Sequence, residues 1–372
     1  MPEHSFYTRL GVRTFINAVG TITTMGGSIM PQKVVQAMAE ASRHFVSLED
    51  LLEKAGARIA QLTGAPAAHI CSGAAGGMML AGAACLTGTD VQAIERLPQV
   101  EGRPDEFIIS LVDSHYYIHQ GFQLCGGRLI KVGTPQQVST ADYANAIGAR
   151  TAAVVFFLGS QPLEQLVELL PVARQQRVPI IVDAAAQLPP RSYLKELTGM
   201  GVDLAVFSGG KGLFGPQSTG LILGRPDLVE ACALNGSPHS AIGRGMKVGK
   251  EEIAGLLTAV ELFMSQDEEA LIREWERRCR TIGAVADQVP GLRAEYTPPF
   301  ANKFPPACPV VHLHFSPAAP HTATQVLTAL HEGEPSIWAG GGGQALSFGP
   351  QTLQEGEAEI IADRLREILA HS

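Results

Sequence analysis

The feature that most constrains this chain is an alternation of short apolar runs with segments of helical periodicity. The runs are rich in β-branched residues and have the length of strands, whereas intervening segments such as 140–150 and 162–177 space their apolar residues as helices do. Such strands, alternating with helices, are typical of a mainly parallel sheet covered on both faces. The sequence therefore predicts an α/β fold. The apolar runs are residues 106–112, 128–132, 151–158, 178–183, 203–208 and 219–224.

After residue 225 the pattern changes. Residues 250–289 have the periodicity of one or two long helices, and shorter strand and helix patterns follow them. We expect a large α/β domain at 46–250 and, at 251–372, a long linking helix with a small α+β domain. A chain of 372 residues is longer than one compact core usually holds, which agrees with this division.

Composition limits the partners and the compartment. The formal net charge of -8 argues against nucleic acid as the main partner, because phosphate backbones bind basic surfaces. The N-terminus lacks the features of a signal peptide, and no apolar run has the length of a membrane span. The six cysteines are scattered without a C-x-x-C pair, which fits neither a disulfide framework nor a zinc site. We therefore expect a cytoplasmic protein.

Three polar elements follow strand-like runs. In the first, Ser72, Gly73 and Ala74 precede a helix of small residues, where backbone N–H groups and the helix dipole favour an anion; tight helix packing is the alternative explanation. In the second, Asp183 ends an apolar strand, where a buried carboxylate needs a cation or hydrogen-bond donors; an ordinary helix N-cap is the alternative explanation. The third is Lys211, in the turn "FSGGKGLFG"; a surface lysine is the alternative there.

One cofactor, pyridoxal 5'-phosphate (PLP), accounts for all three elements. Its phosphate needs backbone N–H groups and a hydroxyl, which the 72–74 turn and Ser208 supply. Its ring nitrogen stays protonated beside a carboxylate, here Asp183, and Ala185 leaves a flat surface for the ring. Its aldehyde needs an amine with a lowered pKa, which Lys211 supplies among apolar residues, with glycines that leave room for the ring.

The stretch "VDSHYYIHQG" offers groups to cover the cofactor ring and to act as a second acid or base. We select His115, which comes soonest after the strand, over His119, and we take Tyr116 as a substrate-binding candidate; a partly buried helix face is the alternative. His312 and His314 lie on one face of a strand, as two metal ligands would. Without a third ligand in the pattern, we expect no metal site.

The chain resembles the selenocysteine synthase (SelA)-like branch of fold-type I PLP enzymes, and within it the D-glucosaminate-6-phosphate ammonia-lyase-like proteins. The resemblance covers most of residues 10 to 265. The stretches that carry it include "CSGAAGGMMLAGAACLTGTD", "IIVDAAAQLPP", "FSGGKGLFGPQSTGLILGR" and "SAIGRGMKVGKEEIAGLLTAVE".

The resemblance implies roles for the motif residues. Lys211 would form the Schiff base, Asp183 would pair with the pyridinium, and residues 72–74 would belong to the phosphate cup. It also implies a homodimer or larger assembly with sites at the interface, to which an N-terminal segment, residues 1–45, contributes. Two further residues are expected near the phosphate of a neighbouring subunit, Gln217 and Thr219.

The chain departs from this pattern in its C-terminal part. Many fold-type I enzymes bind the substrate carboxylate through an arginine of the small domain, whereas here that region reads "EGEPSIWAGGGGQALSFGP". We expect Arg244 to bind the substrate, ahead of Arg9 and Arg13; an ion pair at a dimer interface is an equal alternative for Arg244. The glycines at 340–343 are expected to form a mobile flap over the substrate.

The expected reaction starts at Cα of an amino acid or amino sugar acid. After the substrate has replaced Lys211 on the cofactor as an external aldimine, the released amine removes the Cα proton and leaves a carbanion. We predict an α,β-elimination of the ammonia-lyase type, following the resemblance. The alternative is an amino acid racemase or epimerase with His115 or Tyr116 as second base; aminotransfer comes third, and the acidic chain disfavours selenium transfer to a tRNA. A non-catalytic protein with this fold would lack Lys211 or Asp183.

Overall fold

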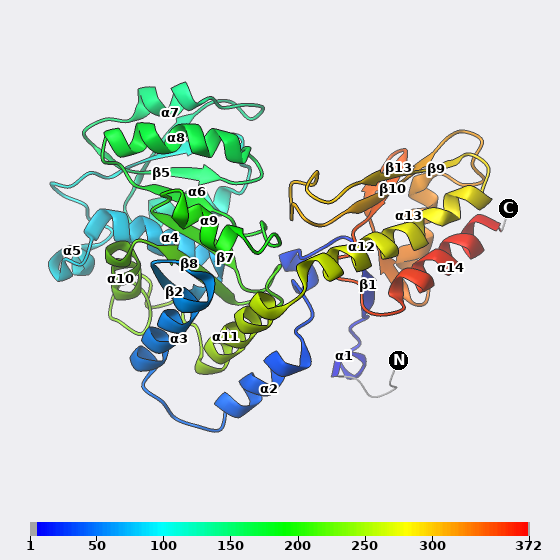
Figure 1. Cartoon of the computed structure of the whole chain (residues 1–372), viewed down its shortest axis with the longest axis horizontal. Coiled ribbons are helices and arrows are strands. Elements are labelled where there is room, and N and C mark those ends of the chain that lie inside the picture. Colours follow the sequence, from blue (N-terminus) through cyan, green and yellow to red (C-terminus); the bar gives the residue numbers. More distant parts are fainter. Residues whose placement is uncertain (1–5, 371–372) are drawn as a thin grey trace. The chain divides into compact units, whose positions relative to one another are not determined.

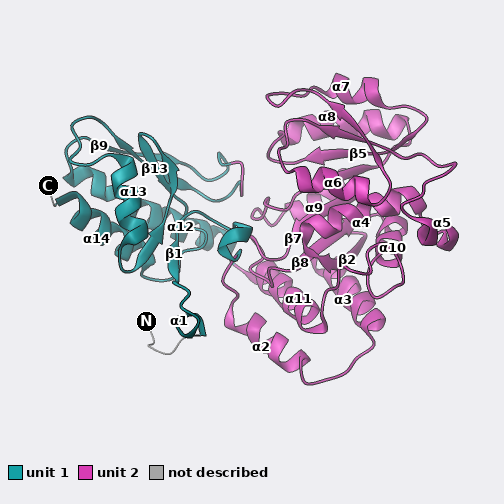
Figure 2. Ribbon diagram, turned by 180° about the vertical axis from the view of Figure 1, so that it is seen from behind, with its two compact units in different colours: residues 1–27, 267–302, 306–372 teal, residues 28–266, 303–305 magenta. Residues whose placement is uncertain are grey.

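A computed structural model describes residues 6–370, which form two compact units (Figure 1, Figure 2). The larger unit consists of residues 28–266 and 303–305, and the smaller unit of the described residues before 28, together with 267–302 and those from 306 onward. None of the helices described in this range combines the length and the apolar character that a bilayer span requires.

The larger unit is built on a seven-stranded sheet. The strands are β2 (Ala67–Ser72), β3 (Glu106–Ser110), β4 (Arg128–Val132), β5 (Thr151–Phe157), β6 (Ile180–Asp183), β7 (Leu204–Ser208) and β8 (Thr219–Gly224). They lie in the order β2, β8, β7, β6, β5, β3, β4, and only β8 runs antiparallel to its neighbours. This arrangement confirms the mainly parallel sheet predicted from the apolar runs.

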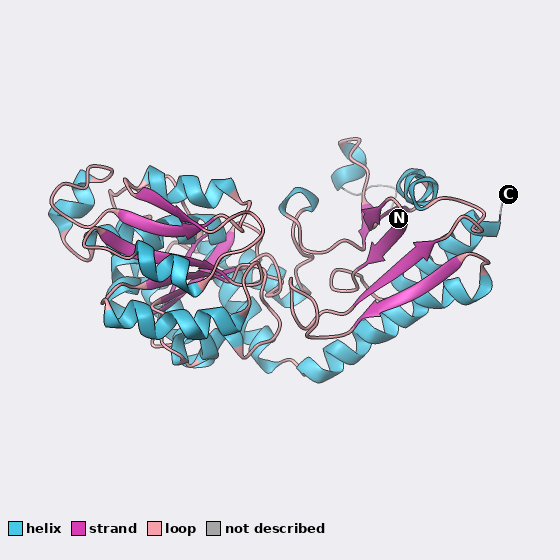
Figure 3. Cartoon of the chain, turned by 90° about the horizontal axis from the view of Figure 1, so that it is seen from above, coloured by secondary structure: helices cyan, strands magenta, loops and turns pink. Residues whose placement is uncertain are grey.

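Helices cover both faces of this sheet (Figure 3). In β5, Val154 and Phe156 enter one core, whereas Val155 and Phe157 enter the other, which explains why the strand is apolar throughout. The first core includes residues of α3 (Leu48–Thr63), α7 (Thr140–Ala146), α8 (Leu163–Gln175), α9 (Tyr193–Gly199) and α11 (Lys250–Ser265). The second includes residues of α4 (Gly73–Thr87), α6 (Tyr116–Leu124) and α10 (Pro226–Asn235). Two outer helices pack on these, α2 (Gln32–Ala41) against α11 and α5 (Val91–Arg96) against α4.

Small residues bring the body of α4 close to the sheet and to helix α6. A Cβ added at Gly77 would lie 2.8 Å from Cγ1 of Val206 and 2.9 Å from Sγ of Cys71, and one at Gly82 would lie 2.7 Å from a buried phenylalanine ring. A Cβ at Gly73, in contrast, would meet no atom closer than 3.9 Å. Packing therefore explains the small residues along the helix, whereas the turn that opens it has space beside it.

The smaller unit contains an antiparallel sheet and a separate parallel strand pair. The sheet has the order β12 (Gly340–Gly342), β13 (Ala345–Phe348), β10 (Val310–Phe315) and β9 (Leu292–Thr297). The pair joins β1 (Phe15–Asn17) to β11 (Ser336–Trp338). The core lies between these strands and α12 (Glu268–Gly283), α13 (Ala323–Glu332) and α14 (Glu357–Ala370). The remaining elements are α1 (Phe6–Arg9) and the 3-10 helices η1 (Thr23–Met25) and η2 (Ala284–Gln288).

The two units divide the chain differently from the expected domain boundaries. The helical segment 250–289 is broken after α11, where the Asp267 side chain caps α12 by accepting a hydrogen bond from the Ala270 N–H (2.9 Å). α11 packs against α2 and α3 and belongs to the larger unit, so the boundary follows Gln266 instead of residue 250. The start of the chain belongs to the smaller unit, because β1 extends β11.

Candidate active site

The predicted site residues meet at the carboxyl edge of the larger unit's sheet. β2, β6 and β7 run in the same direction and end at Ser72, Asp183 and Ser208. β8 runs in the opposite direction, so that Thr219 at its start pairs with Ser72 at this edge. Ligands of parallel sheets bind beyond the carboxyl ends of the strands. The topology therefore gathers the predicted residues where a ligand is expected.

Asp183 is a carboxylate that needs a positive partner. Burial raises its pKa, whereas the hydrogen bond that the Ala185 N–H donates to its Oδ1 (2.9 Å) and the nearby charge of Lys211 lower it. A carboxylate removed from water is stabilised by a cation beside it. The site fits a protonated pyridine nitrogen at Asp183, with Ala185 contributing its backbone as well as its small side chain.

Lys211 follows β7 and shares the electrostatic environment of Asp183. Burial lowers the pKa of the Lys211 amine, and the Asp183 carboxylate opposes this effect. An amine with a lowered pKa gives up its proton more readily and is a better nucleophile toward an aldehyde. Lys211 is thus suited to hold a carbonyl cofactor.

The glycines next to Lys211 allow other segments of the chain to pack closely against the turn. A Cβ at Gly210 would lie 2.4 Å from the Cα of Gln217, and one at Gly212 would lie 2.0 Å from the carbonyl oxygen of Leu188. Their small size thus permits close approach of neighbouring chain segments. Close backbone packing therefore explains Gly210 and Gly212, whereas the sequence analysis had expected these glycines to leave room for a cofactor ring.

The turn at residues 72–74 has the properties of an anion cup. Gly73 has a φ of 69°, which favours glycine. As far as the described residues go, the Ser72 side chain makes no hydrogen bond to α4, although Ser72 occupies the N-cap position. The hydroxyl and the first N–H groups of this long helix are therefore available to a phosphate. Ser208, half-buried at the end of β7, and Ala74, buried in the first turn of α4, lie at the same edge.

The two residues expected near a neighbouring subunit's phosphate differ in exposure. Thr219 is fully buried, and its hydroxyl donates a hydrogen bond to the carbonyl oxygen of Pro216 (2.6 Å). Gln217 is exposed. Of these two side chains, only Gln217 is accessible to a second molecule in the described part of the chain.

The His115 ring contacts the carboxylate of Asp113, a residue that the sequence analysis overlooked. Oδ2 of Asp113 accepts a hydrogen bond from the backbone N–H of His115 (2.9 Å), and its Oδ1 lies 2.7 Å from Nδ1 of the ring. The Asp113 side chain is 3% exposed, whereas that of His115 is 56% exposed. A carboxylate acceptor holds the ring proton on Nδ1, which leaves Nε2 as the nitrogen that exchanges protons.

His119 contacts the same carboxylate from the buried side. Its ring is stacked on that of Phe157, with 5.9 Å between centroids and 9° between planes, and its Nε2 lies 3.8 Å from Oδ2 of Asp113. Neither ring nitrogen of His119 has a hydrogen-bond partner among the described residues. Burial would raise the pKa of Asp113, but its interactions with the two histidines lower it below the usual value. The carboxylate beneath His115 is therefore charged at neutral pH.

Two candidate substrate ligands lie at the surface of the larger unit. Tyr116, the first residue of α6, is mostly exposed. Arg244 is exposed and has no ion-pair partner in the part of the chain that the structure describes. Its loop borders the anion cup, because a Cβ at Gly76 would lie 3.6 Å from Sδ of Met246. Lys247, which the sequence analysis did not single out, is exposed on the same loop.

The other two arginine candidates belong to the smaller unit. Arg13 donates hydrogen bonds to the carbonyl oxygens of His331 (3.2 Å) and Glu332 (3.1 Å) at the end of α13, and it pairs with Glu334. Capping of this helix accounts for Arg13 without a substrate. Arg9 is exposed at the end of α1.

Each histidine of β10 lies near a polar side chain of β9. Nε2 of His312 lies 3.0 Å from the Thr297 hydroxyl, and Nε2 of His314 lies 3.3 Å from a carboxylate oxygen of Glu295. Among residues 6–370, no group of three or more His, Cys, Asp or Glu side chains is arranged to hold a metal ion. The nearby glycine run forms β12, which pairs with β13, so a strand stands where a mobile flap was expected.

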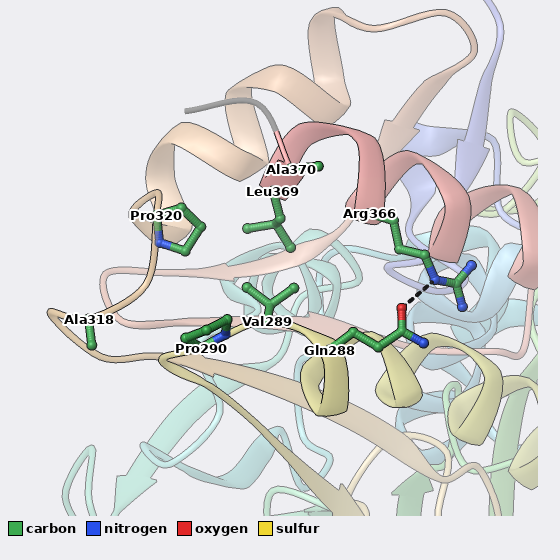
Figure 4. A pocket seen from close by; sticks show the side chains of 8 residues that line it. All are labelled: Gln288, Val289, Pro290, Ala318, Pro320, Arg366, Leu369 and Ala370. Atoms are coloured by element: carbon green, nitrogen blue, oxygen red, sulfur yellow. Dashed lines mark hydrogen bonds between the residues drawn. The ribbon is translucent and has the colours of Figure 1, made fainter.

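The smaller unit has a shallow pocket of its own (Figure 4). Its volume is about 440 Å³, and most of its lining is apolar, with Val289 and Leu369 facing the space. The guanidinium of Arg366 in this lining is held by Gln288 (3.2 Å) and by Asp363 (2.6 Å). An apolar wall with an arginine held in this way provides no group for covalent chemistry, so the carboxyl edge of the larger sheet is the candidate active site.

The fold, together with a half-buried lysine and aspartate at the same sheet edge as an anion cup, defines a fold-type I PLP enzyme. Solved structures share the fold: a serine palmitoyltransferase from Sphingomonas wittichii has a TM-score of 0.60 at 14% identity, covering 95% of this chain and 87% of that one. A "NifS-like protein" has a TM-score of 0.61 at 15% identity, covering 96% and 100%. Within this class, the chain belongs to the SelA family, described as L-seryl-tRNA selenium transferase, which matches residues 15–274.

Relatives along the whole chain carry different names. The 5'-C-glycyluridine monooxygenase-decarboxylase of Streptomyces sp is 34% identical, covering 98% of this chain and 92% of the relative. The D-glucosaminate-6-phosphate ammonia lyase of Salmonella typhimurium is 29% identical and covers 99% of both chains. A solved structure of D-glucosaminate-6-phosphate ammonia-lyase has a TM-score of 0.83 at 28% identity, covering 100% and 99%. These similarities confirm the resemblance that the motifs indicated.

Proposed function

We propose that this protein is a PLP-dependent lyase that eliminates a β substituent and ammonia from an amino acid or amino sugar acid. The proposal rests on the half-buried Lys211 beside Asp183 at the carboxyl edge, in a chain similar over its whole length to an ammonia lyase. Lys211 would hold the cofactor covalently, Asp183 would face its ring nitrogen, and the 72–74 turn with Ser208 would bind its phosphate.

The side chains at this edge divide the proton transfers between them. The bound cofactor supplies an electron sink for the bond that is broken at Cα. Lys211, whose pKa is lowered, accepts the Cα proton as a neutral amine. As an imidazolium ion whose Nδ1–H faces Asp113, His115 would donate its Nε2 proton to the departing β-hydroxyl, which leaves as water. Water then replaces the amine, so that the overall products are a 2-oxo acid and ammonia.

Arg244 and Tyr116 are the proposed substrate ligands. The guanidinium of Arg244 is exposed beside the anion cup without an acidic partner in the described part of the chain, as expected of a carboxylate ligand. Tyr116 follows His115 directly and presents an exposed ring and hydroxyl. The partner molecule is therefore a small anionic amine.

Two other reactions begin at the same Cα. The 34% identity to a monooxygenase-decarboxylase favours loss of the carboxylate as CO₂ in the presence of O₂. The exposed, Asp113-backed imidazole of His115 favours racemisation or epimerisation, in which it would return a proton to the face opposite Lys211. Elimination is preferred because an ammonia lyase has both sequence and structural similarity to this chain over its whole length.

One incubation distinguishes these reactions. The PLP-loaded protein is mixed in deuterated, air-saturated buffer with D-glucosaminate 6-phosphate, 5'-C-glycyluridine or a panel of D- and L-amino acids. Ammonia with a 2-oxo acid supports elimination, CO₂ release supports decarboxylation, and deuterium at an inverted Cα supports racemisation. Lys211→Ala serves as the inactive control. The lyase proposal would be refuted if the protein released CO₂, or inverted the configuration at Cα, while no β-hydroxylated substrate yielded ammonia.

We also propose a homodimer or larger homo-oligomer in the cytoplasm, with the N-terminal segment (residues 1–45) at its interface and sites. Several apolar side chains in and beside this segment are exposed, and Phe45 is completely so; they include Ile29, Val35 and Val46. Water-exposed groups of this kind gain stability when a second copy covers them. The six free cysteines are in keeping with a reducing compartment.

A further inference from the structure

A pocket of the larger unit lies at the edge of the sheet opposite to the one near Lys211. Its volume is about 320 Å³, and its lining comes from the end of α8, the start of β6, the loop before β7 and the residue after β8. Along β6, the pocket residue Ile180 lies about 10 Å from Asp183, and along β7, Asp203 lies about 16 Å from Ser208, at about 3.3 Å per strand residue. The two sites have no residue in common.

The pocket concentrates positive charge on an acidic protein. Three arginines line it, and Asp203 is the carboxylate among them. Both oxygens of Asp203 are engaged, one by the Ile180 N–H (2.8 Å) and one by Nη1 of Arg225 (2.8 Å). Arg174 and Arg177 are exposed and have no acidic partner in the described part of the chain. Two guanidinium groups are therefore left to attract an anion.

The backbone at Arg177 does not explain why an arginine stands there. The residue has a φ of 57° and follows the C-cap of α8, where hydrogen bonds from the Arg177 and Val178 N–H groups (3.0 Å each) close the helix. Helix ends of this kind favour glycine, because a Cβ is strained in the left-handed region. The fold therefore places an arginine in a backbone conformation that glycine would adopt with less strain. The Arg177 side chain lines the pocket, which gives a reason for an arginine at this position.

The absence of a side chain at Gly201 leaves space for the guanidinium of Arg174. Gly201 has a φ of 104°, and a Cβ added to it would lie 2.3 Å from Nη2 of Arg174. Any side chain at position 201 would displace this guanidinium from the pocket wall. The arginine at the helix end and the glycine of the loop before β7 thus fit one another.

We propose that this arginine pocket (Arg174, Arg177 and Arg225) binds a small phosphate-bearing anion, such as a phosphate monoester or a diphosphate. Planar guanidinium groups match phosphate oxygens with paired hydrogen bonds, and two unpaired cations suit a ligand with at least two negative charges. The volume, near the lower limit for small-molecule sites, leaves room for more than one phosphate group. Arg225 is held by Asp203 and Asp227 and forms a fixed wall.

The test uses the full-length, PLP-loaded protein, so that the phosphate cup at residues 72–74 is filled. Inorganic pyrophosphate is titrated at low salt by isothermal calorimetry, and Tm is measured with and without it. We expect one pyrophosphate per chain and a higher Tm. Arg174→Gln should weaken binding about tenfold or more. Arg177→Gly should weaken it similarly, while Tm without pyrophosphate stays equal or rises, because glycine suits this backbone.

Arg96→Gln is the matched control. Like Arg174, Arg96 lies exposed in the last turn of a helix and has no ion pair in the described part of the chain, but it lies outside the pocket. The proposal is overturned if both pocket variants bind as tightly as the parent, if Arg96→Gln weakens binding as much as they do, or if only the PLP-free protein binds pyrophosphate. Absence of saturable binding at millimolar pyrophosphate would also overturn it. None of these results bears on the proposed lyase activity.

Discussion

Asp113→Asn removes the negative charge beneath His115 while it keeps the volume of the side chain. In the native protein, the carboxylate accepts the backbone N–H (2.9 Å) and faces Nδ1 (2.7 Å) of His115 from a buried position. An asparagine offers one oxygen and one NH₂ group. The amide oxygen can accept a hydrogen bond from only one of the two donors, the backbone N–H or Nδ1–H of His115. The NH₂ group must then face the other donor, or the ring must change its tautomer.

The expected magnitudes follow from these two contacts. A hydrogen bond to a charged group contributes about 1.5–3 kcal/mol, so loss of one of them should lower the free energy of unfolding by about 2 kcal/mol. General acid catalysis contributes 10²- to 10⁴-fold, so a misplaced ring proton should lower kcat about 100-fold. Because the pKa of Asp113 is lowered in the folded protein, its stabilisation is complete above the usual value of 3.8 and disappears as pH falls below it.

Three measurements check this prediction. The kcat is measured on the substrate identified above, the unfolding free energy by denaturant titration between pH 3 and pH 7, and the tautomer of His115 by ¹⁵N NMR of the cofactor-free protein. Ser114→Ala, an exposed change in the same loop, should leave all three unchanged. The reasoning is refuted if Asp113→Asn retains kcat within about twofold and the ring proton stays on Nδ1.

Three further predictions concern other parts of the larger unit. Lys211→Ala should abolish both turnover and the absorbance near ~420 nm of the PLP-loaded protein, as seen in a visible spectrum. Gly77→Ala should cost about 1–3 kcal/mol in chemical unfolding, because its Cβ would lie 2.8 Å from Cγ1 of Val206; an undiminished midpoint would contradict this packing. Burial, with a contribution from His239, lowers the pKa of His69 to about 4, so the folded protein resists a proton that the unfolded chain binds. Stability should therefore fall by about 3 kcal/mol as pH drops from 6.5 to 4, and His69→Gln should lack this slope.

Lys211 and Asp183 share a property that the sequence reveals: each is a charged group placed at or just after the end of an apolar strand. Burial of a charged group without a partner is costly enough that chemistry is the simplest explanation. Asp113 was overlooked because an aspartate in a loop after a strand has the appearance of an ordinary turn residue. Its importance comes from the packing of α6, which brings His119 to the buried side of the carboxylate.

The alternation of apolar strands and helices by itself determined the parallel sheet and the edge at which the site forms, because side-chain periodicity and burial are local properties of the chain. Tertiary structure alone decided what depends on distant segments. β1 joins the smaller unit through β11, and the glycine run becomes strand β12 through β13. Arg174, Arg177 and Arg225 line one pocket because β8 returns antiparallel to β7 and ends beside the start of β7, which is the neighbour of β6. No periodicity encodes such meetings, since they arise from strand order and not from sequence spacing.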